Sequence, residues 1–218
     1  AVVLIDKPLE WTSFDVVSKV RNAIRVKKVG HAGTLDPLAT GLLILCTGKM
    51  TKKIDEYQAQ EKEYEGELLL GKTTPSIDGE TEVDNEYDIS AITETQIREA
   101  VKQFIGTISQ FPPIYSAIKV NGEPLYKKAR RGEAIEIKSR EVTVSEFEIT
   151  KVELPKVAFR IVCSKGTYIR SLVRDLGLAL NNGAYMTALR RTRIGKFTVQ
   201  EAYDLPSFIA QYKVTKIE

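Results

Sequence analysis

The stretch Gly30–Leu45, GHAGTLDPLATGLLIL, decides how this chain folds. Its first half is typical of a loop, because Gly30 and Gly33 free the backbone and Pro37 stiffens it just after Asp36. Its second half is a short apolar run of the kind that is buried in a sheet. A carboxylate on a stiff loop anchored by a buried strand is well placed to act on a ligand. The pattern equally fits an ordinary tight turn in which Asp36 binds its own backbone, and the residues alone leave both interpretations open.

The composition is that of an ordinary globular protein. The chain has 218 residues, 43% of them apolar and 28% charged, which suffices for one sizeable core or two small ones. No apolar run approaches the length of a membrane helix. The first residues, AVVLIDKP, contain neither a basic segment nor a cleavage site, so we expect no export signal. These features predict a cytoplasmic protein without membrane contacts.

Few residues are available for metal or nucleophilic chemistry. His31 is the only histidine, and no serine lies in a nucleophile-elbow context, which argues against Ser-His-Asp catalysis. Cys46 and Cys163 lie in apolar runs without metal-ligand spacing, and we expect them to be reduced core thiols. The pattern predicts neither a metal nor a cofactor. Redox-neutral chemistry built on Asp, Tyr, Lys and Arg remains open.

The charges are segregated, although the net charge is only +3. Basic residues cluster at residues 21–28, 49–53, 127–131 and 190–196, whereas residues 78–88 are strongly acidic. A basic face for a polyanion and a solvated acidic face would explain this segregation. Any one cluster is also explained as exposed surface, but four clusters flanking the motifs below favour a nucleic-acid partner.

Hydrophobic periodicity predicts the regular elements. We expect strands at residues 2–5, 42–45, 61–70, 134–149 and 157–163, and helices at residues 12–25, 49–57, 93–105, 125–131 and from residue 169 onward. Scattered strands with helices between them, and no regular βαβ alternation, predict an α+β fold with a mixed sheet. Without an internal repeat or a linker, residues 1–218 are predicted to form a single domain.

Local signals mark several ends of these elements. Thr12 with Asp15, and Thr93 with Gln96, form capping boxes, and Asn121-Gly122 is a hairpin turn signal. The helix at residues 93–105 is expected to turn four side chains inward, namely Ile97, Val101, Phe104 and Ile105. The basic helix at residues 125–131 is stopped by Gly132.

Six segments together resemble the TruB family of tRNA pseudouridine synthases. They are GHAGTLDPLATGLL, DKPLEWTSFD, EKEY, FPPIYSAIKVNGEPLYKKARRGE, SKGTYIRSLVRDLG and MTALRRTRIGKFTV, and the resemblance runs from Asp6 to Leu205. It implies a mixed, largely antiparallel central sheet flanked by helices, with an inserted segment at about residues 119–140 that clamps RNA. It also implies a short bacterial form without a C-terminal RNA-binding module. The family usually has glycine where this chain has Glu10.

The resemblance assigns roles to individual residues. It implies that Asp36 is catalytic, that Arg170 pairs with it, and that Tyr64 is the active-site tyrosine. Tyr168 and Leu189 would line the base pocket. The remaining positions are expected to bind RNA: His31, Lys7, Lys52, Lys127, Lys128, Arg130 and Arg131.

Three of these positions can also be judged from the residues alone. Tyr64 fits a half-buried strand aromatic. His31 fits a loop residue bonded to the backbone as well as a side chain that fills the space vacated by a flipped base. Arg170 lies in the first turn of its helix, where the helix dipole disfavours a cation, so we expect an anion near it.

The resemblance implies isomerisation of uridine to pseudouridine, at uridine 55 in the T arm of tRNA. The N1–C1′ bond breaks, the base turns, and C5 joins C1′, so no cofactor is required. Asp36, with an ordinary aspartate pKa of about 3.9, would be ionised and could stabilise charge at C1′, add to it, or take a proton from the sugar. Base flipping would bring the uridine into the pocket. The expected partner is the tRNA T stem-loop, bound by a monomer that requires no protein partner.

Three other functions compete with this one. A non-catalytic RNA-binding or RNA-folding module would explain the basic clusters equally well, but it does not need the set Asp36, Tyr64 and Arg170. A relative that works with guide RNAs in a protein complex normally carries further RNA-binding segments. A glycoside hydrolase would need a second carboxylate opposite Asp36, and no matching motif presents one.

Overall fold

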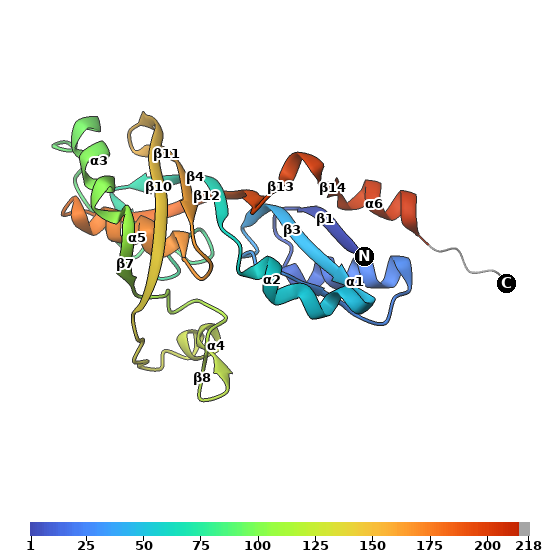
Figure 1. Cartoon of the computed structure of the whole chain (residues 1–218). Coiled ribbons are helices and arrows are strands. Elements are labelled where there is room, and N and C mark those ends of the chain that lie inside the picture. Colours follow the sequence, from blue (N-terminus) through green and yellow to red (C-terminus); the bar gives the residue numbers. More distant parts are fainter. Residues whose placement is uncertain (214–218) are drawn as a thin grey trace. The chain divides into compact units, whose positions relative to one another are not determined.

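The computed structural model describes residues 1–213 and is drawn in Figure 1. The chain divides into two compact units. Unit 1 contains residues 1–65 and the chain from Ala188 onward, and unit 2 is Gly66–Thr187. Two strands, β4 (Lys62–Leu70) and β12 (Ala184–Ile194), contribute residues to both units.

Unit 1 is built around strand β3 (Ala39–Thr47), the apolar run that the sequence predicts. The strand order here is β14-β1-β3-β12-β4. Strands β1 (Val2–Lys7) and β2 (Val29–His31) pair with β3 antiparallel, whereas β12 pairs with it parallel. Strand β13 (Phe197–Thr198) extends β12, and β14 (Tyr203–Asp204) lies parallel to β1.

Both faces of β3 are covered, which explains its continuous apolar sequence. On one face Leu43 and Leu45 pack against helices α1 (Ser13–Ile24) and α6 (Leu205–Tyr212). On the other face Leu42, Ile44 and Cys46 pack near helix α2 (Ile54–Gln58) and two 3₁₀ helices, η1 (Gly48–Lys53) and η3 (Val199–Glu201). The loop before β3 is therefore anchored in the best-packed strand of the unit.

The predicted capping box at the start of α1 is confirmed. The Thr12 hydroxyl accepts a hydrogen bond from the Asp15 amide at 3.0 Å, and the Asp15 carboxylate accepts one from the Thr12 amide at 2.9 Å. Val16, Val17 and Val20 are buried on the inner face of the helix.

The strands of unit 2 lie in the order β12-β4-β11-β10-β7, and β10 pairs antiparallel with both β11 and β7. Its long strands are β10 (Arg140–Glu153) and β11 (Lys156–Cys163), with β7 (Gly106–Gln110) at the edge. Helix α5 (Ile169–Ala179) and helix α3 (Glu94–Ala100), which continues as the 3₁₀ helix η2 (Val101–Phe104), belong to this unit. A small hairpin pairs β5 (Lys72–Thr73) with β6 (Asn85–Glu86). The predicted α+β fold with a mixed, largely antiparallel sheet and flanking helices is confirmed.

Two predictions of secondary structure in unit 2 are wrong. The strand predicted at residues 134–149 begins only at Arg140, because its partner β7 ends at Gln110 and the following Pro112 and Pro113 cannot donate to a ladder. Ile105 is 45% exposed rather than inward, because α3 tightens into η2 and the side chains no longer follow the α-helical period.

The segment comprising residues 119–140, which we call the insert, extends past the lower end of β10 in Figure 1. Its hairpin joins β8 (Lys119–Val120) to β9 (Glu123–Pro124). Asn121 and Gly122, with φ of 55° and 81°, form the predicted two-residue turn. Helix α4 (Leu125–Arg130) follows, and Gly132 has a φ of 70° just after it. That the units and the insert work as one catalytic domain stays a prediction.

The departure from glycine at Glu10 has a structural cost. Glu10 is exposed and has a φ of 65°, a left-handed conformation that side chains other than glycine adopt at a cost of roughly 1–2 kcal/mol. We expect Glu10→Gly to raise the free energy of unfolding by about 1 kcal/mol, since part of the relief is offset by a more flexible unfolded chain. Chemical denaturation measures this, and Glu10→Ala, which keeps the strain, is the control. A lower stability for the glycine variant would contradict the explanation.

Candidate active site

The loop that carries Asp36 is held on both sides of the aspartate. Before it, the buried Ser13 hydroxyl accepts from the Leu35 amide at 2.9 Å and donates to the Leu35 carbonyl at 3.3 Å. After it, the Pro37 carbonyl accepts from the Glu10 amide at 2.8 Å. The Ala39 amide donates to the Asp36 carbonyl at 3.0 Å and closes a turn with proline in its second position. Local backbone bonds and the start of α1 therefore fix the position of Asp36.

A buried lysine supports the same loop. The side chain of Lys7 is inaccessible to solvent, and its ammonium donates to the carbonyls of Pro8 at 2.9 Å, Trp11 at 2.5 Å and Pro37 at 3.3 Å. Burial lowers the pKa of Lys7 to about 8, although the Asp36 carboxylate acts in the opposite direction. Lys7 thus places a cation beside Asp36, and its burial argues against the RNA contact that we expected from it.

The lowered pKa of Lys7 predicts how stability changes with pH. Between pH 8 and 10.5 the unfolded chain still holds a proton on Lys7 that the folded protein has released, so this residue makes the free energy of unfolding rise with pH. We expect Lys7→Met to remove that rise, whereas Lys19→Met, an exposed lysine on α1, should keep it. Denaturation series at pH 8, 9 and 10 measure the difference. Equal slopes in wild type and Lys7→Met would contradict it.

Arg191 is a second buried cation behind the loop, and it is not among the residues that the sequence predicts for the site. Its guanidinium donates to the carbonyls of Leu42 at 2.8 Å and Gly33 at 3.0 Å. Gly41, with a φ of 104°, lets the backbone of β12 approach β3 closely at Arg191, because a Cβ on Gly41 would lie 2.3 Å from the Arg191 carbonyl oxygen. The alternation of buried residues in β12, with Leu189 and Arg191 two apart, is the signal that could have shown it.

The basic cluster at residues 190–196 is consequently not a free RNA-binding face. Arg191 is buried. Arg190 pairs with Asp6 at 2.7 Å, and Arg193 pairs with Glu61 at 3.1 Å. These cations hold strands of unit 1 together, so the expectation that the whole cluster faces a polyanion is wrong.

His31 ends strand β2 and is half-buried. Burial lowers the pKa of its imidazole, and the charge of Arg191 lowers it further. Its Nδ1 has no hydrogen-bond partner among the described residues. The side chain of His31 is thus uncharged at neutral pH. An uncharged ring is better suited to fill the space vacated by a flipped base than to bind a phosphate.

Two further predicted residues of unit 1, Leu189 and Tyr64, lie on β12 and β4, which are neighbouring strands of the sheet. Leu189 on β12 is in register with Ala39, the first residue of β3, and is 8% exposed. Tyr64 on β4 is equally buried. Unit 1 therefore brings Leu189 and Lys7 close to the loop of Asp36. Lys52 lies apart from them, exposed on η1.

In unit 2 Arg170 lies in the first turn of α5, almost fully buried. Its guanidinium donates to the carbonyls of Ser76 at 2.9 Å and Tyr115 at 2.8 Å, and its Nε is 3.8 Å from the Asp78 carboxylate. The expected nearby anion is therefore present in the form of Asp78, which is also buried. The sequence predicts that residues 78–88 form a solvated acidic face, and this prediction is wrong for Asp78. The pairing of Arg170 with Asp36, which lies in the other unit, stays a prediction.

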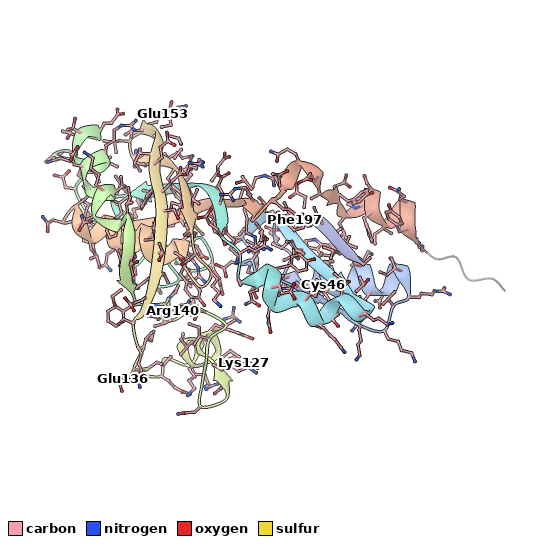
Figure 2. The ribbon with its side chains drawn as sticks, in the orientation of Figure 1. Cys46, Lys127, Glu136, Arg140, Glu153 and Phe197 are labelled. Carbon is pink, nitrogen blue, oxygen red and sulfur yellow. The ribbon has the colours of Figure 1, made fainter. Side chains whose placement is uncertain are left out.

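The cations of helix α4 fall into two kinds. Arg130 pairs with Glu80 at 2.6 Å, and Arg131 pairs with Glu123 at 2.7 Å and Glu133 at 2.6 Å. Lys127 is exposed and Lys128 half-buried, and no ion pair of either is found among the described residues. Figure 2 labels Lys127 on this helix. The lysines are therefore the cations of the insert most available to a phosphate.

Comparison with known proteins decides the family. Residues 21–169 match the domain described as TruB family pseudouridylate synthase (N terminal domain), and residues 170–217 match the tRNA pseudouridylate synthase B C-terminal domain. The chain belongs to the TruB family. The TruB resemblance inferred from the six motifs is thereby confirmed.

Similar TruB proteins match along nearly the whole chain. The tRNA pseudouridine synthase B of Flavobacterium johnsoniae is 56% identical over 214 residues, which cover 95% of this chain and 93% of the relative. The protein of the same name from Parabacteroides distasonis is 50% identical and covers 100% of this chain and 96% of the relative.

Solved structures agree on the fold. A chain in the "Crystal Structure of a Cbf5-Nop10-Gar1 Complex" has a TM-score of 0.75 and 30% identity over 97% of this chain and 54% of its own length. A chain in the "Structure of H/ACA RNP bound to a substrate RNA containing 2'-deoxyuridine" has a TM-score of 0.73 and 29% identity, and the match covers 97% of this chain and 53% of that chain. This TruB chain thus spans about half the length of those two chains.

No helix in residues 1–213 is long and apolar enough to cross a membrane. Within the same residues, no three His, Cys, Asp or Glu side chains are grouped so that they could hold a metal ion.

Proposed function

We propose that this TruB protein converts uridine 55 in the T arm of tRNA to pseudouridine, as a cytoplasmic monomer that requires no protein partner. The observation that carries the proposal is the Asp36 loop, held at Leu35 by Ser13 and at Pro37 by Glu10 and Lys7. Rigid support of a single carboxylate is what a catalytic group needs. The relatives named tRNA pseudouridine synthase B support tRNA as the substrate.

The proposed chemistry uses only groups of the chain. Asp36 acts at the C1′/C2′ end of the ribose while the N1–C1′ bond breaks and the C5–C1′ bond forms. C5 then loses its proton and N1 takes one up, so the base is isomerised without a change of mass. Arg170 pairs with Asp36 and keeps it ionised. Tyr64, Tyr168 and Leu189 enclose the flipped base, and His31 fills the space that the base leaves.

The test is mass mapping of pseudouridine in tRNA from cells with and without this protein. We expect a single T-arm pseudouridine to disappear when the protein is absent. If tRNA is unchanged while the purified protein still binds it, the non-catalytic RNA-binding function is favoured. If a different uridine is affected, the family activity stands and the proposed target is wrong.

The insert makes a further prediction about salt dependence. Each phosphate contact contributes about 0.7 to 0.9 to the slope of log affinity against log salt. We expect the double variant Lys127→Ala/Lys128→Ala to flatten this slope by as much as two phosphate contacts contribute to it. The matched variant Arg130→Ala/Arg131→Ala should flatten it less, because both arginines are already paired with carboxylates. Filter binding of a T-arm stem-loop at several salt concentrations measures both, and an unchanged slope for the lysine variant would contradict RNA contact by this helix.

A further inference from the structure

Tyr168 is held in place by a buried side chain from another strand. It is the N-cap residue of α5, and the Gln110 amide at the end of β7 binds its backbone twice. Gln110 Nε2 donates to the Tyr168 carbonyl at 3.1 Å, and Gln110 Oε1 accepts from the Tyr168 amide at 2.8 Å. Gln110 is inaccessible to solvent. The backbone of Tyr168 is therefore fixed independently of its ring.

The ring of Tyr168 is covered on one face by Arg140. The centre of the Arg140 guanidinium lies 4.8 Å from the ring centroid, within the range of a cation–π interaction. The same guanidinium donates to the carbonyl of Gly166 in the loop before α5. A planar cation bonded at its edge and stacked on its face has little rotational freedom, so it holds the ring as well as covering it.

Arg140 and Gln110 are directly opposite each other, as the cross-strand pair at the end of the β10–β7 ladder. Arg140 is also the residue at which the insert joins β10, and Figure 2 labels it at the lower end of that strand. A displacement of the insert would therefore move Arg140, and through Arg140 the ring of Tyr168. Gln110 would meanwhile keep the backbone still.

The contact is costly as a purely structural feature. Arg140 Nε is buried and has no hydrogen-bond partner among the described residues. An unmade hydrogen bond of this kind destabilises a fold, and an apolar side chain would cover the ring without it. The presence of arginine here is better explained by what it does to the ring.

We propose that Arg140 is a positioning residue that holds Tyr168 as a platform for the target base and links the insert to the base pocket. The inference rests on the proposed function, in which Tyr168 lines that pocket. With Arg140 on one face, only the opposite face of the ring can stack on a base. Arg140 acts through Tyr168 and does not itself contact the RNA.

The test is a double-mutant cycle under single-turnover conditions with a T-arm stem-loop. We expect Arg140→Met to slow pseudouridine formation at least tenfold while RNA affinity and its salt slope stay within twofold of wild type. Arg140→Lys, which keeps the charge but not the planar stacking, should restore only part of the rate. In a Tyr168→Leu background the same Arg140→Met change should have little further effect, because the ring on which it acts is gone. Arg160→Met, an ion-paired arginine on β11, is the matched control and should leave the rate unchanged.

Three results would overturn the inference. A wild-type rate in Arg140→Met would show that the stacking is irrelevant to catalysis. A flatter salt slope in that variant would show that Arg140 contacts a phosphate instead. Equal slowing by Arg140→Met with and without the Tyr168 ring would show a general effect on folding. If wild type itself forms no pseudouridine, the proposed function fails first, so the two failures are distinguishable.

Discussion

Replacing Asp36 with asparagine is expected to abolish turnover and leave RNA binding nearly intact. The amide keeps the shape of the side chain but can neither supply negative charge at C1′ nor add to it. The loop should keep its position, because hydrogen bonds to the backbone of Leu35 and Pro37 hold it on both sides of the aspartate. RNA affinity should change little, or rise as repulsion between the carboxylate and the phosphates is relieved.

Two measurements on the same RNA test this prediction. Tritium release from uracil labelled at C5 reports turnover, and filter binding at fixed salt reports affinity. Asp55→Asn, an exposed aspartate on α2, is the control for loss of one negative charge and should retain full activity. Retained turnover in Asp36→Asn would remove Asp36 from the mechanism, whatever its effect on binding.

The second large effect is expected at Arg170, on stability. Arg170→Met removes two hydrogen bonds to carbonyls and leaves the Asp78 carboxylate buried without its cation. Breaking a buried pair from one side costs about 3–5 kcal/mol, a large part of the stability of a typical domain. We expect the free energy of unfolding to fall by that amount, and adding Asp78→Asn should recover part of it.

Arg174→Met is the matched control for this prediction, because it changes the same residue type on the same helix. Arg174 pairs with Asp175 at 2.8 Å, but both side chains are partly exposed, so the loss should be about 1 kcal/mol or less. Urea denaturation of the variants measures the differences. Equal losses for Arg170→Met and Arg174→Met would show that the buried pair has no special role in the fold.

The parts of the fold that local chemistry decides were predictable. The capping boxes at Thr12 and Thr93 set the starts of α1 and α3, and Asn121-Gly122 set the turn of the insert. Each of these signals lies within four residues of its effect. The buried strand β3 was equally visible, because a strand covered on both faces must be apolar throughout.

The buried cations were not predictable, because long-range contacts decide them. Arg191 binds Leu42, which is 149 residues away in the chain, and Arg170 binds Ser76, which is 94 residues away. For Arg170 the sequence indicates a nearby anion but not which residue supplies it. It shows Arg191 only as a charge, and charges are normally exposed. Lys7 and Asp78 were misjudged for the same reason, and all four proved to be internal supports.

The most direct test of the account is product analysis with the purified protein alone. The protein is treated with EDTA, dialysed, and incubated with an unmodified T-arm stem-loop whose nucleosides are then identified after digestion. Isomerisation by Asp36 predicts one pseudouridine per RNA at the T-arm uridine, an unchanged RNA mass, and no product with Asp36→Asn. A stem-loop that is bound but stays fully uridine, or pseudouridine formed by Asp36→Asn, would contradict it.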